Sequence, residues 1–328
     1  MFPDRRASCG RVPFTSPASF LTPNPPLNPQ PSLLNSQPSP LTPAAAFKFS
    51  HHPCRTGLSF PDGEHITTPR PHETIKVADL PPAFDWYAFP SLTSLGQIET
   101  SDGTNFLTLL KNQHIPTFCG SCWAMATISA KTNKPLNLRH TPLTPKPHPD
   151  GQVLINCGGG GTCGGGDPGA AYKYMAKQGL PDETCQNYEA VNGKCAPFGL
   201  CETCDPNPFL PGTCSAVTSY NRYYADEYGS VGGADKMKAE IFARGPISCG
   251  VHVTDAFENY KGGVFETSFD PFVFLLDHEI SVVGWGTDTT GQYWVGRNSW
   301  GSYWGEKGFF RIRMHKYPSP SHVDQTPV

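Results

Sequence analysis

The sequence predicts an α+β protein in which a helical first half precedes a β-rich second half. Three observations support this class: helix patterns with capping residues occur up to residue 244, strand patterns between glycine-rich turns follow, and cysteines crowd into the helical half. With 328 residues, of which 38% are apolar, the chain is long enough for one or two domains with a core. A functional site is then expected in a cleft between the two halves.

The N-terminal region differs from the rest in composition. Residues 1–46 contain eleven prolines among Ser, Thr and Asn, which predicts a disordered segment, and they show no apolar stretch typical of a signal peptide. Residues 47–79 are polar and rich in histidine, and the globular pattern begins at Leu80. We therefore expect a folded domain over 80–316, preceded by a short polar segment at 47–79 and followed by a tail at 317–328.

Local signals predict three helices. Residues 120–134 have few helix breakers before the proline that follows, so a helix is expected to stop there. Asp167 and Pro168 suit the N-cap and first turn of a second helix, which Gly179 ends. A third helix over Ala234–Arg244 ends at a Gly-Pro pair.

The residue pattern of the sequence changes after the third helix. Short runs of β-branched and aromatic residues between glycine-rich turns predict strands. We expect these strands at Ile247–Val253, Glu279–Val283, Tyr293–Gly296 and Phe309–Arg313.

Charge and cysteine content limit the function classes. The net charge of −3 offers no electrostatic footprint for nucleic acid or a membrane surface, and no run of 18 apolar residues is present. Seven of the twelve cysteines fall in under 60 residues, which predicts disulfides and an oxidising compartment. A zinc site at Cys201-x-x-Cys204 is the alternative, although no second CxxC pair stands at the spacing of a zinc ribbon. The crowded cysteines are Cys157, Cys163, Cys185, Cys195, Cys201, Cys204 and Cys214.

A candidate nucleophile stands in the run Cys119-Gly-Ser-Cys122-Trp. A thiol attacks a carbonyl as thiolate, and Cys122 is placed to begin a helix whose N-terminus stabilises an anion. An imidazole is the second requirement, and His278, at the start of a predicted strand, supplies it. Asn298, in Arg-Asn-Ser-Trp-Gly, can orient that ring, with Trp300 covering their hydrogen bond. The alternatives are a structural His278 and a thioredoxin-type redox pair of Cys119 with Cys122.

These residues resemble the papain-like cysteine peptidases from about Leu80 to Lys316, and within them the cathepsin X group, also called cathepsin Z. Gln113 stands nine positions before Cys122, three more than in most relatives, and the insertion carries His114-Ile-Pro as in that group. The resemblance implies a two-subdomain papain-like fold. It has a helical left half (about 80–215), an antiparallel β-barrel-like right half (216–316) and the active-site cleft between them. Further matching runs are 69–73, 78–81, 179–185 and 245–250.

The resemblance also implies roles for single residues. Gln113 and the Cys122 backbone N–H would form the oxyanion hole. His114 would bind the C-terminal carboxylate of a peptide, which makes the expected activity a carboxypeptidase that removes single residues. Gly165 and Gly166 would let the substrate backbone approach, and the four glycines at 158–161 are expected to be only a loop. The aromatic residues expected to contact substrate are Trp300 and Trp304.

Regulation and context follow from the same resemblance. Residues 47–79 would be a short propeptide whose Cys54 forms a disulfide with Cys122 and keeps the nucleophile inactive until a reductant opens the bond. A monomer without cofactor or metal is expected, in a lysosome or vacuole or outside the cell, with peptide C-termini as substrates and cystatin-type inhibitors as partners. The implied disulfides are Cys119–Cys163, Cys157–Cys195, Cys185–Cys201 and Cys204–Cys214.

Three departures from the family pattern leave competing functions open. Pro135 and a proline-rich stretch at 141–149 interrupt the first half, and about ten extra residues lie between Trp86 and Asn112. The family also continues after Lys316 through a strand whose cysteine pairs with the equivalent of Cys249, whereas residues 317–328 of this sequence hold no cysteine. A non-catalytic relative damaged in its second half is therefore one competing function. The others are an endopeptidase or dipeptidase of the same family and a thiol-disulfide oxidoreductase that uses Cys119 and Cys122.

Overall fold

The computed structural model describes residues 63–87, 107–131, 148–206, 212–266, 276–314 and 326–327. The chain divides into two units, Met1–Lys48 and Phe49–Val328, and the described residues all belong to the second. The segment expected to be disordered, 1–46, and Cys54 lie outside the described residues. Within the described ranges no helix is both long and apolar enough to cross a membrane.

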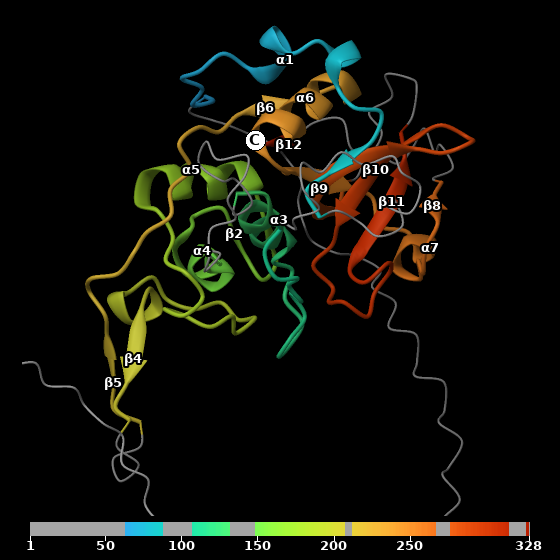
Figure 1. Cartoon of the computed structure of the whole chain (residues 1–328). Coiled ribbons are helices and arrows are strands. Elements are labelled where there is room, and N and C mark those ends of the chain that lie inside the picture. The colour runs from blue at the N-terminus through green and yellow to red at the C-terminus, as the bar shows by residue number, and fades with distance from the viewer. Residues whose placement is uncertain are drawn as a thin grey trace, which may run out of the picture. The chain divides into compact units, whose positions relative to one another are not determined.

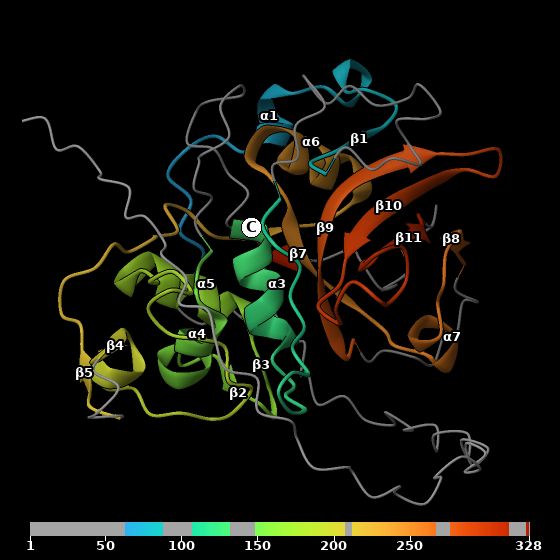
Figure 2. The ribbon, with the colours of Figure 1, turned by 60° about the horizontal axis from the view of Figure 1, so that its bottom comes forward.

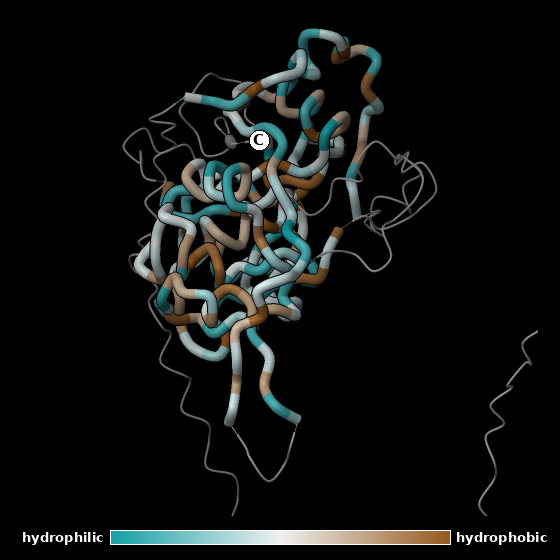
Figure 3. Tube along the Cα trace, turned by 90° about the vertical axis from the view of Figure 1, so that its left-hand side faces the viewer, coloured by the Kyte–Doolittle hydropathy of each residue, from teal (hydrophilic) through white to brown (hydrophobic). Residues whose placement is uncertain are grey.

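The first half of the domain is built from helices and small hairpins (Figure 1). Its helices are α3 (Cys122–Lys131), α4 (Gly151–Cys157), α5 (Pro168–Gln178) and the short η2 (Pro197–Gly199). Two antiparallel hairpins accompany them, β2 (Gly161–Thr162) with β3 (Gly165–Gly166), and β4 (Glu202–Cys204) with β5 (Cys214–Ala216). The β4–β5 hairpin projects from the packed body, which Figure 3 shows from the side.

Local capping explains where these helices begin and end. Asp167 caps α5 by accepting from the Gly169 N–H at 2.7 Å, and Gly179 ends it with a φ of +68°. Asp150 caps α4 in the same way, by accepting from the backbone N–H of Gln152. The predicted span of α5 is confirmed, whereas α4 was not predicted.

Four disulfides whose cysteines are both described tie this half together. They join Cys119 to Cys163, Cys157 to Cys195, Cys185 to Cys201, and Cys204 to Cys214. Cross-links of this kind typically stabilise a fold by about 2–4 kcal/mol each. The zinc alternative is wrong, because the sulfurs of Cys201 and Cys204 belong to two different disulfides.

The second half is a six-stranded sheet with helix α6 (Ala234–Arg244) and the short α7 (Asp255–Glu258). The strand order is β1-β9-β10-β11-β8, with β7 also pairing with β9. All pairs are antiparallel, as expected for this half, except β8 with β11, which is parallel and lies at the edge of the sheet. The strands are β1 (Phe84–Asp85), β7 (Ile247–Val251), β8 (Val264–Phe265), β9 (His278–Thr287), β10 (Gln292–Arg297) and β11 (Phe309–Arg313).

Aromatic side chains fill the core of the second half. Trp304 lies edge-on to Trp300 with ring centroids 5.2 Å apart, and Phe257 packs edge-on against Phe310 at 4.9 Å. A second buried cluster surrounds α3 and α4 and includes Trp123. The two halves meet where α3 packs against β9 (Figure 2), which places the start of α3 beside the strand that carries His278.

Residues 63–79 lie over α6, at the top of Figure 1. Arg70 donates to the Ser230 carbonyl at 2.6 Å and pairs with Glu64. Arg244 at the end of α6 donates to the Thr68 hydroxyl at 2.8 Å and to the Pro69 carbonyl at 2.9 Å. This segment, with α1 (Pro71–Thr74) and η1 (Val77–Asp79), is therefore held against the second half by hydrogen bonds. Nearby, β6 (Ser230–Val231) pairs with β12 (Thr326–Pro327).

Candidate active site

Cys122 is the first residue of α3 and is completely buried. The Ser121 carbonyl accepts the Ala124 and Met125 N–H groups, so the helix begins at the cysteine with its positive dipole end toward the sulfur. In this structure Cys122 is disulfide-bonded, and its partner lies outside the described residues. The sulfur is thus shown in a blocked state.

His278 and Asn298 are brought together by the antiparallel pairing of β9 and β10. His278 begins β9 and Asn298 directly follows β10, and the His278 Nε2 lies 2.8 Å from the Asn298 Oδ1. Since Oδ1 is an acceptor, Nε2 carries the proton in this contact, and Nδ1 is the nitrogen that can exchange a proton with a thiol. The Trp300 ring lies 4.8 Å from the imidazole and is only 6% exposed, so it screens the hydrogen bond from water.

Gln113 is buried, and both ends of its side-chain amide are hydrogen-bonded. Its Nε2 donates to the Cys119 carbonyl at 3.0 Å, and its Oε1 accepts from the Ser299 hydroxyl at 2.6 Å. The Tyr188 hydroxyl donates to the Gln113 carbonyl at 2.8 Å. An amide nitrogen has two hydrogens, so one is left for a further acceptor.

His114 stands at the start of the inserted loop and is half-buried. Its ring stacks on Phe118 at 4.8 Å and faces Trp300 at 6.3 Å. The loop continues through a cis Ile115–Pro116 bond, and Ile115 is 60% exposed. The rings of His114 and His278 therefore both lie against the Trp300 ring, so His114 is near the His278–Asn298 pair.

The candidate substrate glycines lie on β3, against the ring of Trp123. Gly165 has a φ of +112°, and a Cβ at Gly166 would come within 2.6 Å of the Trp123 ring. A Cβ at Gly161 would approach the same ring to 2.9 Å. The expectation that 158–161 is only a loop is wrong at Gly161, which belongs to β2, whereas 158–160 lie outside helices and strands.

Trp304 lies behind the site rather than in it. The ring is 5% exposed, its Nε1 donates to the Glu258 carbonyl at 2.8 Å, and its edge packs on Trp300. Its position is that of a residue that supports Trp300. The redox alternative is not supported either, because Cys119 bonds to Cys163 rather than to Cys122.

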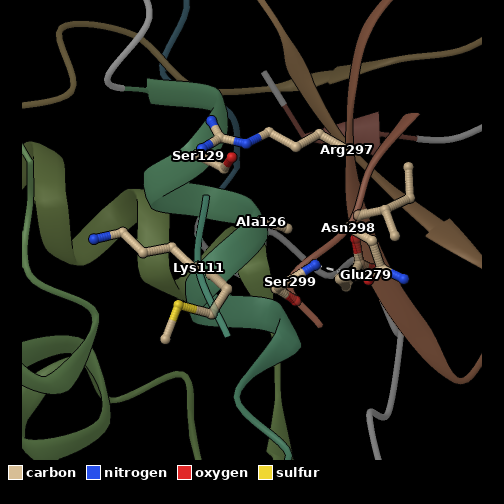
Figure 4. Close-up of a pocket in the computed structure, with 9 residues that line it drawn as sticks. Lys111, Ala126, Ser129, Glu279, Arg297, Asn298 and Ser299 are labelled. Atoms are coloured by element: carbon tan, nitrogen blue, oxygen red, sulfur yellow. Dashed lines mark hydrogen bonds between the residues drawn. The ribbon is translucent and has the colours of Figure 1, made fainter. Parts of the chain in front are cut away.

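Sequence reasoning missed Ser299 and Tyr188, which hold Gln113, and Glu279, which follows His278. Ser299 had a signal, since it directly follows Asn298, whereas Tyr188 lies far away in the sequence. Figure 4 shows the small pocket next to the site, where Glu279, Asn298 and Ser299 of the sheet face Ala126 of α3. Arg297, also at this pocket, is buried and donates to the Thr108 carbonyl at 2.8 Å, and burial lowers its pKa to about 10.

A cysteine at a helix N-terminus and an imidazole oriented by an amide are the groups that define the class of cysteine peptidases. Comparison with known proteins agrees with this class. The profile of the papain family cysteine proteases matches residues 97–326. The chain belongs to the papain family of cysteine proteases.

Individual relatives show how close the likeness is. Cathepsin Z of Onchocerca volvulus is 40% identical over 263 residues, which span 78% of this chain and 78% of that protein. Cathepsin B-like cysteine proteinase 6 of Caenorhabditis elegans is 32% identical over 59% of this chain and 55% of its own length.

Among solved structures, procathepsin L 3 of Tenebrio molitor superposes with a TM-score of 0.61 at 21% identity, covering 84% of this chain and 76% of that one. Bromelain from Ananas comosus superposes with a TM-score of 0.53 at 24% identity, over 75% of this chain and 98% of its own. These structural likenesses show the papain-like fold.

Proposed function

We propose that the chain is a cysteine-type carboxypeptidase that removes single residues from peptide C-termini. The observation that carries this proposal is the position of His114, on an inserted loop and against the same Trp300 that covers the His278–Asn298 pair. The relative whose name is cathepsin Z is 40% identical to this chain over 78% of its length.

The chemistry uses Cys122, His278 and Gln113. After reduction, Cys122 and His278 form a thiolate and imidazolium pair, and the sulfur attacks the last peptide carbonyl carbon. The amide of Gln113 and the Cys122 N–H donate to the oxyanion. The imidazolium then protonates the leaving amino group as the C–N bond breaks, which leaves a thioester. Water, deprotonated by the neutral imidazole, hydrolyses the thioester and restores the thiol.

His114 explains the restriction to the last residue. A protonated imidazole can donate to a carboxylate in a charge-assisted hydrogen bond, which is stronger than a neutral one. The exposed Ile115 and Phe118 follow it on the inserted loop, so chain extending past the carboxylate would meet this loop. The loop therefore favours substrates that end one residue after the scissile bond.

Peptides that differ only at the C-terminus test this role. With a free carboxylate the enzyme is expected to release one residue at a time, and amidation is expected to lower kcat/KM about 10–100-fold, as loss of a charged hydrogen bond of about 1.5–3 kcal/mol requires. His114→Ala should cause the same loss on the free peptide and no further loss on the amidated one.

The matched control is His148→Ala, at a half-buried histidine in the segment before α4, and it should leave both rates unchanged. Internal cleavage of the amidated peptide at the rate of the free one would instead establish an endopeptidase, and release of two residues a dipeptidase. Absence of all cleavage by reduced, folded protein would establish a non-catalytic relative.

We further propose that the protein is made as a zymogen blocked by a Cys54–Cys122 disulfide. Two observations support it: Cys122 is disulfide-bonded here, and residues 63–79, downstream of Cys54, are held against the second half by hydrogen bonds. A reductant thiolate would attack the Cys54 sulfur, the S–S bond would break, and Cys122 would leave as the thiolate. A second thiol of the reductant would then resolve its mixed disulfide with Cys54.

Thiol labelling of the full-length chain without reductant tests the zymogen. An epoxide directed at cysteine peptidases should label Cys54→Ser at Cys122 at once, and should label the unmodified chain only after reduction. Cys9→Ser is the matched control and should behave as the unmodified chain. Stoichiometric labelling of the unmodified, unreduced chain at Cys122 would contradict the proposal.

We also propose that the enzyme works in a lysosome or vacuole, or outside the cell. The four disulfides of the helical half support an oxidising folding route. Peptide and protein C-termini are its proposed substrates, and cystatin-type inhibitors its proposed partners. Detection of the tagged protein by microscopy together with a lysosomal marker tests the location.

A further inference from the structure

A glutamate sits in the core directly beside the catalytic histidine. Glu279 follows His278 on β9 and is 1% exposed. Its Oε2 is buried and has no hydrogen-bond partner among the described residues. Across the strands it stands opposite Gly250 of β7, where a Cβ would lie 3.5 Å from the Glu279 Oε1, an ordinary contact distance.

The surroundings of Glu279 offer no positive charge to compensate an ionised carboxylate. From α5 it is influenced by the negative charge of Asp167, and it acts in turn on Tyr172, whose hydroxyl is joined to Ser248 of β7 at 2.8 Å. Cys249 follows Ser248 on β7 and lies near Tyr172 of α5. The residues that α3 contributes to the pocket, Met125, Ala126 and Ser129, carry no charge.

The two cations that line the same pocket are engaged elsewhere. Lys111 pairs with Glu183, and the Arg297 guanidinium donates to Thr108 and to the Leu109 carbonyl. Figure 4 shows the Arg297 side chain extending toward Ser129 and away from Glu279, and the Lys111 side chain pointing to the opposite side of α3. His278, on the same strand, is directed to Asn298.

Such a site holds a neutral carboxylic acid better than a carboxylate. Burial of an unpaired charge is costly, and the group keeps its proton instead. Burial, with a further contribution from the negative charge of Asp167, raises the pKa of Glu279 to about 8.

We propose that Glu279 is a positioning residue: its neutral carboxyl group keeps β9 packed against α3, and so keeps His278 aligned with Cys122, and its ionisation loosens this packing as the pH rises. The geometry supports the link, because β9 carries His278, α3 carries Cys122, and Glu279 lies with residues of both elements around one pocket. The group does not touch the substrate and acts through the histidine beside it.

The sign of the pH dependence follows from proton binding. The folded protein keeps the Glu279 proton up to about pH 8, whereas the unfolded chain releases it near the ordinary value of 4.5. Between these values the folded state binds more protons, so stability falls as the pH rises. Below about pH 4.5 the contribution of Glu279 to stability is constant, and above about pH 8 its destabilising effect is complete.

The test uses Glu279→Gln, which keeps the shape of the protonated acid but cannot ionise. At pH 5 the reduced variant and the unmodified enzyme should have the same melting temperature and the same rate of Cys122 alkylation. As the pH rises from 5 to 8, the melting temperature and the Cys122 alkylation rate of the unmodified enzyme should both fall. In the variant, the pH at which half of the alkylation rate is lost should be higher by about one unit or more. The melting temperature and the alkylation rate do not depend on carboxypeptidase specificity, so both can still be interpreted if the proposed function is wrong.

Glu202→Gln is the matched control, because the pKa of Glu202 is also raised by burial but the residue lies on the β4–β5 hairpin. It should leave the pH curves unchanged. Should the glutamine variant fail to fold at pH 5, Glu279→Leu is expected to give the same upward shift. Superimposable pH curves for the Glu279 variants and the unmodified enzyme, or an equal shift in Glu202→Gln, would overturn the proposal.

Discussion

Cys122→Ser is expected to abolish peptide hydrolysis, with kcat lower by about 10⁴-fold or more, as is typical when a catalytic nucleophile is removed. The thiol of an unperturbed cysteine ionises near pH 8.5, and a helix N-terminus with an adjacent imidazole brings that within reach of mildly acidic conditions. A serine hydroxyl in the same place stays protonated, so the ion pair with His278 does not form. The measurement is single-turnover release of a C-terminal residue by the reduced enzyme.

The control for this prediction is Cys249→Ala, which removes another buried cysteine, on β7. It should retain most of the activity, since β7 contributes no group to the reacting atoms. Binding of an uncleaved peptide should be unchanged in Cys122→Ser. Hydrolysis by Cys122→Ser at the unmodified rate would mean that another residue is the nucleophile.

Gln113→Ala is expected to lower kcat by about 10²–10³-fold, or about 2.7–4 kcal/mol of barrier, with little change in KM. The amide donates to an oxygen that becomes negative only as the tetrahedral intermediate forms, so its loss affects the reaction and not substrate binding. Steady-state kinetics on a peptide with a free C-terminus separate the two parameters.

Ser299→Ala is the matched control for Gln113, because it removes the donor to Oε1 and leaves the amide nitrogen in place. Its effect on kcat should be clearly smaller than that of Gln113→Ala. A rise in KM at constant kcat for Gln113→Ala would instead mean that the amide binds the ground state of the substrate.

Helices were predictable where their signals are local. Asp167, Pro168 and Gly179 define α5 within a few residues of each helix end, and the glycine after Arg244 ends α6. Strand lengths were less predictable because pairing is not local. Strand β9 continues to Thr287 since it pairs with β1 and β10 beyond the predicted Val283, and β7 ends at Val251 where its pairing with β9 ends.

The candidate site was predictable to the extent that it lies in short sequence motifs. Cys122, His278, Asn298 and Gln113 each stand in such a run. Tyr188 reaches Gln113 only through the tertiary fold, so nothing near it in the sequence signals the contact. Glu279 was missed because nearly every residue of β9 is buried, so the strand shows no alternation of apolar and polar faces that would single out one position.

The contact between Trp123 and the glycines of β2 and β3 has a consequence for the natural variation of this enzyme. A side chain at Gly166 or Gly161 would displace a ring whose neighbour in the chain is Cys122. A Cβ at Gly161 would also come within 2.3 Å of the Gly166 Cα, and one at Gly166 within 2.7 Å of the Gly160 carbonyl oxygen, so a smaller residue in place of Trp123 would not make room for either. Among homologues, both positions are therefore expected to keep glycine whatever residue stands in place of Trp123, and an alignment of relatives would check this.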